Sequence, residues 1–274
     1  MITFPNAKIN LGLSVVGKRP DGYHNLETVF YPVGLSDALE VVTAPLSNDC
    51  TLRVSGMQVD GETADNLVVK AYREFQKHFD LPGIEVDLYK KIPFGAGLGG
   101  GSSDAAFMLS MLRRMFKLPL SDAQMEEIAA RLGADCAFFC RNVPIYAEGI
   151  GDQFTPVSLS LKNYSLVIVK PAFGVSTKVA FSGISPRSAQ INVRRIVEDY
   201  PVEQWQELLM NDFETTVFKA YPVLEEIKNK LYHHGAVYAS MSGSGSAVFG
   251  LFVQMPDLQS CFPDCFYWSG PCNY

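Results

Sequence analysis

Residues 93–104 read Pro93-Phe94-Gly95-Ala96-Gly97-Leu98-Gly99-Gly100-Gly101-Ser102-Ser103-Asp104, and five of them are glycine. Each glycine loses roughly 0.5–1 kcal/mol of chain entropy on folding, but it lets the backbone adopt positive φ and approach a ligand closely. Before this loop, apolar residues alternate with others over 84–88 and predict a strand, and an apolar run predicts a helix over 105–115. Because a helix N-terminus offers unpaired N–H groups, strand, loop and helix together predict a phosphate site.

Other glycine-rich loops fit less well. A Walker A loop needs a lysine after its last glycines, and here Gly101 is followed by Ser102 and Ser103. Residues 95–100 match the dinucleotide pattern GxGxxG, but that pattern requires an acidic residue about 20 positions later, where this chain has Leu120. The HRD and DFG motifs of protein kinases are absent from the sequence. A purely structural turn stays the alternative.

The remaining pattern mixes strands and helices without strict alternation, which predicts an α+β protein. We expect strands at 2–16, 28–33, 38–42, 52–54, 165–170, 236–241 and 247–253, and helices at 67–79, 135–140, 202–218 and 222–234. Ser121 and Gln124 form a capping box for a further helix that ends at Gly133 as its C′ residue. A composition shift near 149–156 predicts two domains, 1–152 and 153–274.

Composition limits the class of protein. The chain has 274 residues, of which 47% are hydrophobic and 19% charged, so it is globular and not disordered. Its 23 basic and 29 acidic residues give a net charge of −6, which disfavours sequence-independent binding of nucleic acid. No apolar run reaches the roughly 18 residues of a membrane span, and the N-terminus lacks signal-peptide features. We expect a cytoplasmic protein without membrane contact.

The six cysteines do not predict a metal site. They include no CxxC pair and no nearby histidine with the spacing of zinc ligands. We expect them to be reduced structural thiols. The aromatic, cysteine-containing stretch 261–268 is expected to close the last sheet edge.

Three segments, in order and spacing, resemble the motifs of the GHMP kinase superfamily. They are Pro5-Asn6-Ala7-Lys8-Ile9-Asn10-Leu11, the glycine loop extended to Ala106, and Met241-Ser242-Gly243-Ser244-Gly245-Ser246-Ala247. The resemblance covers nearly the whole chain. It implies a two-domain kinase fold, with an N-terminal domain like ribosomal protein S5 domain 2 and a ferredoxin-like C-terminal domain.

Two segments resemble one family within this superfamily, the 4-diphosphocytidyl-2-C-methyl-D-erythritol kinases. One runs from Gly17 to Leu26 and contains Asp21-Gly22-Tyr23-His24, and the other runs from Gly133 to Phe139. In the second, Cys136 and Ala137 replace the usual valine and proline, a change we do not expect to affect the chemistry. The family uses ATP to phosphorylate the 2-hydroxyl of its cytidine-diphosphate-linked substrate in non-mevalonate isoprenoid biosynthesis. The alternatives are a homoserine or mevalonate kinase, a non-catalytic nucleotide-binding protein and, least favoured, a Rossmann oxidoreductase.

The resemblance also implies roles for individual residues. Asp135 is the base that accepts the hydroxyl proton, with Lys8 as the second catalytic residue. A helix cap for Asp135 and an exposed strand edge for Lys8 are the structural alternatives. On the substrate side, the resemblance implies that Tyr23 and Phe181 stack on the cytosine and that His24 bonds its edge. Asn10 is also a substrate residue, and core packing is the alternative for Phe181.

The nucleotide side is likewise implied by the resemblance. ATP would contact Asn66, Leu67, Pro93, Phe94, Gly95, Ala96, Gly97, Leu98, Gly99, Gly100, Gly101, Ser102 and Ser103. ATP chemistry implies Mg²⁺, for which Ser102 and Ser103 are candidate contacts and no carboxylate ligand can be named. The expected partners are ATP and the small-molecule substrate, and the chain is expected to be a monomer or a weak homodimer.

Overall fold

The structure, a computed structural model, describes residues 1–58, 61–184, 186 and 191–274. These residues form two compact units whose segments interleave along the chain. Unit 1 comprises Met1–Ala7, Leu35–Phe94 and Gly99–Asn142, and unit 2 comprises Lys8–Gly34, Gly95–Leu98 and Val143–Tyr274. The predicted domains, 1–152 and 153–274, are divided at a single point, and that division stays a prediction.

Unit 1 contains a four-stranded sheet in the order β1-β4-β6-β5. Its strands are β1 (Ile2–Thr3), β4 (Ala38–Thr43), β5 (Cys50–Gly56) and β6 (Ile84–Lys90). β4 is antiparallel to both neighbours, whereas β5 is parallel to β6. Buried and exposed residues alternate along β6, as its sequence predicts. On the exposed face Arg53 binds Asp87 at 2.8 Å and Glu85 at 3.2 Å, so this face is polar.

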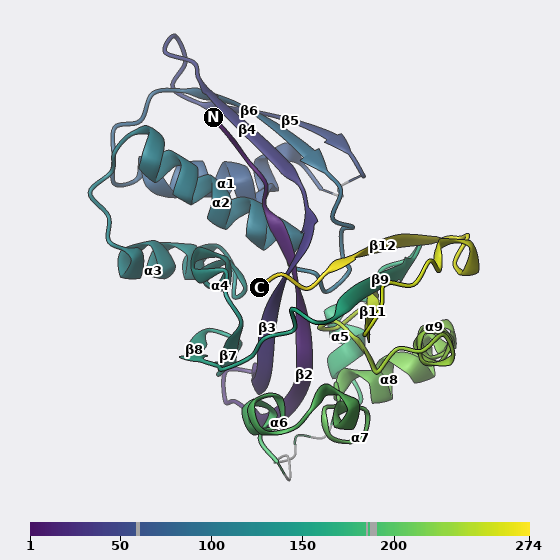
Figure 1. The fold of residues 1–274 in the computed structure, drawn as a ribbon. Helices are drawn as coiled ribbons and strands as arrows, with labels where there is room; N and C mark the ends of the chain where they lie inside the picture. The colour runs from purple at the N-terminus through teal and green to yellow at the C-terminus, as the bar shows by residue number, and fades with distance from the viewer. Residues whose placement is uncertain (59–60, 185, 187–190) are drawn as a thin grey trace. The chain divides into compact units, whose positions relative to one another are not determined.

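The helices of unit 1 are grouped on the other face of this sheet, where those over 67–76 and 100–115 pack against its strands and the two that follow pack against these helices (Figure 1). They are η1 (Thr63–Asp65), α1 (Leu67–Gln76), α2 (Gly100–Met115), α3 (Asp122–Leu132) and α4 (Cys136–Arg141). Apolar residues of β6, such as Val86, pack with Phe75 of α1 and Leu112 of α2 in one buried cluster. The amphipathic strand and helices therefore bury their apolar faces against each other.

Helix ends in unit 1 confirm some predictions and change others. The capping box of Ser121 and Gln124 is present at the start of α3. That helix ends before Gly133 as predicted, but Gly133 has φ 174°, an extended conformation and not the left-handed one common at C′. α2 begins at Gly100, earlier than the predicted Ala105. The prediction started the helix too late because glycine has a low intrinsic helix propensity and Gly100 and Gly101 therefore did not indicate a helix.

Unit 2 contains most of a sheet in the order β2-β3-β7-β8 and all of a sheet in the order β10-β11-β9-β12. The strands of the first are β2 (Asn6–Lys18), β3 (His24–Ser36), β7 (Ile145–Glu148) and β8 (Gln153–Pro156). Those of the second are β9 (Ser165–Pro171), β10 (Tyr238–Met241), β11 (Val248–Phe252) and β12 (Cys265–Pro271). The predicted strand at 2–16 is interrupted between Thr3 and Asn6, where Pro5 has no N–H to donate. β12 pairs with β9 at a sheet edge, which confirms the expectation for the cysteine-containing stretch.

The helices of unit 2 include the one predicted at 222–234, whereas the one predicted at 202–218 is divided into shorter pieces. They are α5 (Thr177–Phe181), α6 (Val193–Asp199), η2 (Val202–Gln204), α7 (Trp205–Leu208), α8 (Phe213–Ala220), α9 (Pro222–His233) and η3 (Gln259–Cys261). A single helix at 202–218 is wrong, because the chain leaves helical geometry between Leu208 and Phe213. There Asn211 donates to two backbone carbonyls, and the Asp212 carboxylate accepts from the amide of Val15. These tertiary bonds outweigh the local helix preference.

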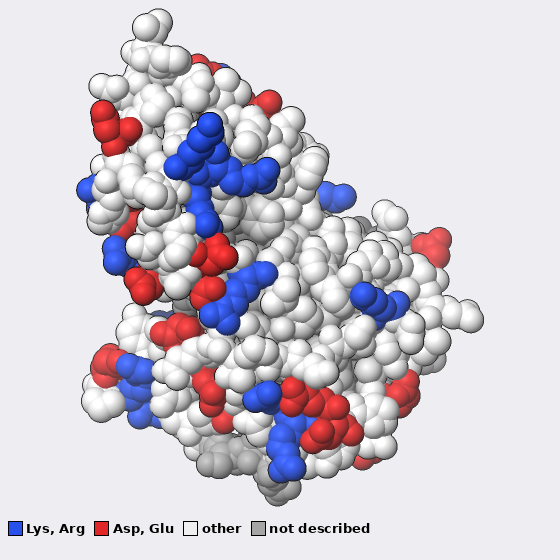
Figure 2. Space-filling model, turned by 60° about the vertical axis from the view of Figure 1, so that its left-hand side comes forward, with Lys and Arg blue, Asp and Glu red and all other residues white. Residues whose placement is uncertain are grey.

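Across both units, mixed helices and mostly antiparallel strands confirm the α+β prediction. The face in Figure 2 carries basic and acidic side chains interspersed among uncharged ones. Among the residues that the structure describes, no helix is long and apolar enough to cross a membrane. None of the six cysteines forms a disulfide in the structure.

Candidate functional site

In unit 2, Lys8 lies buried on β2, with 4% of its surface exposed. Its Nζ donates to Asn10 Oδ1 at 2.7 Å and to the carbonyl of Gly97 at 3.1 Å, and it lies 5.1 Å from the centre of the Phe30 ring. The alternative of an exposed strand-edge lysine is therefore wrong. A buried ammonium surrounded by oxygen acceptors and an aromatic face is held in one position.

The Gly95–Leu98 part of the first glycine loop and the loop at 242–246 contact each other. Ser242 Oγ donates to the carbonyl of Gly97 at 2.8 Å, and the amide of Ala247 donates to the carbonyl of Ala96 at 3.1 Å. Gly97 has φ +72°, and a Cβ there would lie 2.0 Å from the carbonyl oxygen of Ser242. Only glycine allows this approach, which brings two motifs 145 residues apart into one network.

The first motif joins the same network through Asn10. Its backbone amide donates to Ser242 Oγ at 3.3 Å, and its side-chain Nδ2 donates to Thr28 Oγ1 at 3.0 Å. Asn10 is 2% exposed, and both ends of its side chain have protein partners. Sequence analysis did not single out Thr28, although a polar residue within the apolar run at 28–33 is a detectable signal.

Two of the predicted substrate residues come together in unit 2. The rings of His24 and Phe181 stack with centroids 4.7 Å apart and an angle of 22° between their planes. Phe181 also makes an edge contact with Phe213, which holds it against α8. Tyr23 precedes His24 in a turn where its amide donates to Asp21 Oδ1 at 3.0 Å, and its side chain is exposed. The exposed Tyr23 ring therefore belongs to the residue that directly precedes one member of the stacked pair.

In unit 1, the start of α2 carries the rest of the glycine loop. Gly99 has φ +71° and precedes the helix, so the first amides of α2 follow a left-handed turn that glycine adopts readily. A Cβ on Gly101 would lie 3.8 Å from Leu67 Cδ1, which places Leu67 beside the loop. Asn66 caps α1 by accepting from the amide of Val68 at 3.0 Å. This cap fixes where Leu67 begins its helix.

Asp135 lies at the N-cap position of α4, but its side chain makes no capping hydrogen bond. The helix-cap alternative is therefore not supported. The neighbouring Cys136 hydrogen-bonds with Ser102 of the glycine loop, and burial raises the pKa of its thiol to about 11. Asp135 therefore directly precedes a residue that contacts the predicted phosphate loop. Because its pKa is raised, Cys136 is a neutral thiol at physiological pH.

A buried cluster of one lysine and two aspartates lies at the backbone just before the glycine loop and at the helix that follows it. The sequence analysis did not predict this cluster. Lys90 Nζ, at the end of β6, donates to Asp104 Oδ2 of α2 at 2.6 Å and also to Asp37. Asp37 Oδ1 accepts from the amides of Lys91 at 2.6 Å and Ile92 at 2.8 Å, just before the loop. Burial lowers the pKa of Lys90, but the two carboxylates outweigh it and raise that pKa overall. The sequence did contain a signal for this cluster, because Lys90 falls on a buried position in the alternating pattern of β6.

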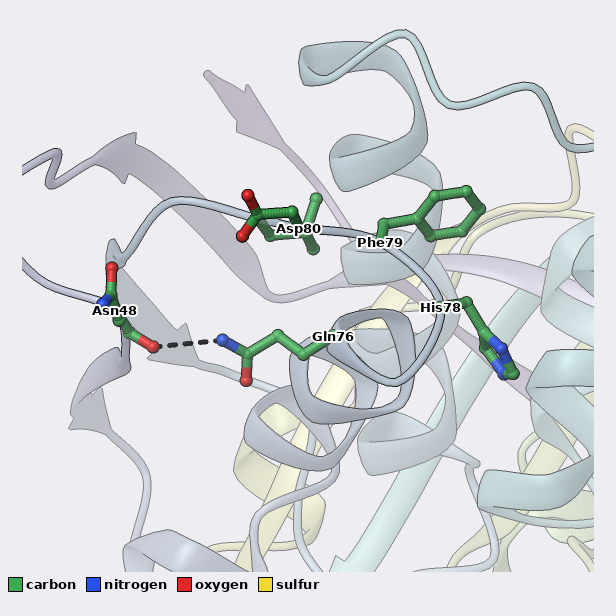
Figure 3. Close-up of a pocket in the computed structure, with 6 residues that line it drawn as sticks. Asn48, Gln76, His78, Phe79 and Asp80 are labelled. Atoms are coloured by element: carbon green, nitrogen blue, oxygen red, sulfur yellow. Dashed lines mark hydrogen bonds between the residues drawn. The ribbon is translucent and has the colours of Figure 1, made fainter.

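The described residues contain no group of three or more histidine, cysteine, aspartate or glutamate side chains placed to hold a metal ion. The open pocket in Figure 3 lies in unit 1, where Gln76 Nε2 donates to the carbonyl of Asn48 at 3.0 Å. It is lined by Asn48, Gln76, His78, Phe79, Asp80 and Leu81. None of the predicted site residues lines it, so the pocket is separate from the predicted chemistry.

Known proteins resemble the chain over most of its length. Residues 66–142 match the family described as GHMP kinases N terminal domain, and residues 202–260 match GHMP kinases C terminal. The 4-diphosphocytidyl-2-C-methyl-D-erythritol kinase of Bacteroides thetaiotaomicron is 59% identical over 92% of this chain and 92% of its own. The chain belongs to this family of GHMP kinases. The family member from Parabacteroides distasonis is 51% identical and covers 98% of this chain and 99% of its own.

Solved structures agree with this membership in the GHMP kinase family. A crystal structure of 4-(cytidine 5'-diphospho)-2C-methyl-D-erythritol kinase matches with a TM-score of 0.85 and 31% identity, covering 98% of each chain. The mevalonate kinase of Methanococcus jannaschii matches with a TM-score of 0.73 and 13% identity, covering 100% of this chain and 98% of its own, which shows a shared fold alone. The predicted family and the GHMP kinase fold are confirmed.

Proposed function

We propose that this chain transfers the γ-phosphoryl group of ATP to the 2-hydroxyl of 4-diphosphocytidyl-2-C-methyl-D-erythritol, giving the 2-phosphate and ADP. The observation that carries the proposal is 59% identity over 92% of the chain to a kinase named for this substrate. The step belongs to non-mevalonate isoprenoid biosynthesis. The chain's membership in a kinase family supports ATP as the phosphoryl donor.

On the nucleotide side, the residues at the start of α2 fit a triphosphate. The 16-residue helix directs its first amides and the positive end of its dipole toward this loop, where phosphate oxygens are stabilised. Ser103 Oγ is fully buried and has no hydrogen-bond partner among the described residues, which suits a group that meets a ligand. Mg²⁺, bound with the nucleotide, would neutralise phosphate charge. Ser102 and Ser103 are the proposed hydroxyl contacts on this side.

At the reacting hydroxyl, Asp135 is the proposed base. The hydroxyl oxygen forms a bond to the γ-phosphorus as the bond from that phosphorus to the β–γ bridging oxygen breaks, and ADP leaves. The proton passes to the carboxylate of Asp135 and then to solvent. Lys8 is the proposed second catalytic residue, because a buried ammonium can stabilise the negative charge that develops on the attacking oxygen.

On the substrate side, the rings of Tyr23, His24 and Phe181 are proposed to bind cytosine. Stacking on aromatic side chains is worth about 1–3 kcal/mol per base, and a histidine can also bond a base edge. Homoserine and mevalonate lack a nucleobase, so they would not stack on these rings. A cytoplasmic location and a monomeric or weakly dimeric state stay predictions.

A direct assay tests the substrate. The protein is incubated with ATP, Mg²⁺ and 4-diphosphocytidyl-2-C-methyl-D-erythritol, with homoserine and mevalonate in parallel, and phosphorylated product is measured by mass. We expect product from the cytidine compound alone. Product from another alcohol would overturn the substrate, and product from none would favour a non-catalytic nucleotide-binding protein.

Asp135→Asn tests the base. General-base catalysis typically contributes about 10²–10⁴-fold, so kcat should fall by this range while the affinities for ATP and substrate stay within several-fold. Asp122→Asn is the matched control, because that carboxylate lies at the start of α3 with 90% of its side chain exposed. Near wild-type turnover of Asp135→Asn would exclude the proposed base.

A further inference from the structure

Thr28 is buried and contacts Asn10, the residue that accepts from the predicted catalytic lysine, and nothing in the proposed chemistry uses it. Its surface is 1% exposed, and its Oγ1 donates to the carbonyl of Gly12 at 2.6 Å. A hydroxyl has one hydrogen to donate and two lone pairs that accept. Since the hydrogen is committed to Gly12, Thr28 can only accept from its other neighbour.

That neighbour is the side-chain amide of Asn10, 3.0 Å away. An asparagine amide has an oxygen end and an NH₂ end of nearly equal size, and its partners determine which way it faces. An acceptor at Thr28 selects the NH₂ end, so the oxygen end must face the opposite way. There Oδ1 accepts from Lys8 Nζ at 2.7 Å.

The reverse orientation would be unfavourable on both sides. It would turn the NH₂ group of Asn10 toward the Lys8 ammonium, placing donor against donor in a buried site. It would also place the amide oxygen against the lone pairs of Thr28. The bond from Thr28 to Gly12 therefore determines, through Asn10, where two oxygens hold the ammonium: Asn10 Oδ1 and the carbonyl of Gly97 at 3.1 Å.

We infer that Thr28 is a positioning residue that sets the place of the Lys8 ammonium through the orientation of the Asn10 amide. This inference rests on the proposed function, because it assumes that Lys8 acts in phosphoryl transfer. It also gives Asn10 a role toward Lys8 in addition to its predicted role toward substrate. Thr28 itself touches neither substrate nor nucleotide in this scheme.

Thr28→Val tests the inference, because valine keeps the branched shape and removes only the acceptor. We expect kcat to fall about tenfold, the effect of losing one buried hydrogen bond, with the KM for ATP unchanged. Thr28→Ser keeps the oxygen and should restore turnover. Thr155→Val in β8 makes the same change elsewhere in the same sheet and should leave kcat unchanged. Thermal melting of each variant verifies folding, and Thr28→Ala replaces Thr28→Val if the latter does not fold.

A double-variant cycle separates positioning from a structural role. If Thr28 acts through Lys8, adding Thr28→Val to Lys8→Ala should cause no further loss of turnover. A further tenfold loss in that background, or wild-type kcat in Thr28→Val alone, would overturn the inference while leaving the proposed function intact. Wild-type turnover of Lys8→Ala would instead overturn the role of Lys8 in the proposed function and this inference with it.

Discussion

Gly97 and Gly95 provide a matched pair for testing why the glycine loop needs glycine. Both have positive φ, +72° for Gly97 and +60° for Gly95. A Cβ at Gly97 would lie 2.0 Å from the carbonyl oxygen of Ser242, whereas a Cβ at Gly95 would have nothing within 4 Å. Gly97→Ala thus adds a clash to the backbone strain, and Gly95→Ala adds the strain alone.

The expected magnitudes follow from these two terms. An L-residue in the left-handed region costs about 1–2 kcal/mol, and overpacking a tight contact costs about 1–3 kcal/mol more. Gly95→Ala should therefore lower the free energy of unfolding by about 1–2 kcal/mol and Gly97→Ala by about 2–5 kcal/mol. Both variants lose the same unfolded-state entropy on changing glycine to alanine, so that contribution cancels in the comparison.

Differential scanning calorimetry of the two variants and the wild type measures the difference. At roughly 2–4 °C per kcal/mol for a chain of this size class, Gly97→Ala should melt several degrees below Gly95→Ala. Gly97→Ala should also lose more turnover, because the Gly97 carbonyl accepts from both Lys8 and Ser242. Equal melting temperatures for the two variants would refute the close approach of the two glycine loops.

Three further predictions concern a cap, a binding surface and a titrating group. Ser121→Ala removes the capping box with Gln124 and should lower the unfolding free energy by about 1 kcal/mol in urea titrations; no change would contradict the cap. Tyr23→Ala should raise the KM for the cytidine substrate at least fivefold, by about 1–3 kcal/mol of stacking, with no change in Tm or in the KM for ATP. Burial and the charge of Glu148 raise the pKa of Glu27, so the native state holds this proton to higher pH than the unfolded state. The free energy of unfolding should thus fall as pH rises from the unfolded to the folded pKa of Glu27. Urea titrations across this pH range should show that Glu27→Gln removes this fall, and a variant with the same pH profile as the wild type would contradict the raised pKa.

Local sequence patterns were sufficient to predict the secondary structure of elements whose conformation depends on residues close in sequence. The alternation of β6, the spacing in α1 and the capping box at Ser121 depend on residues close in sequence, and each was predicted with small errors at the ends. Short elements with weak patterns, such as β7 and α6, were missed because a few residues carry little periodic signal. The predicted helix at 202–218 failed because Asn211 donates to the carbonyls of Met241 in β10 and of Gly243 in the loop that follows it.

The sequence by itself determined the family, the α+β class and the glycine loop, because these depend on motifs and on residue types that impose a conformation wherever they occur. Only the tertiary structure decided which groups meet. Lys8, Gly97 and Ser242 share one network although they are far apart in the chain, and Lys90 joins Asp37 to Asp104 below the loop. A buried charge or amide is stable only when its partners are in place, and those partners come from segments that meet only when the chain folds.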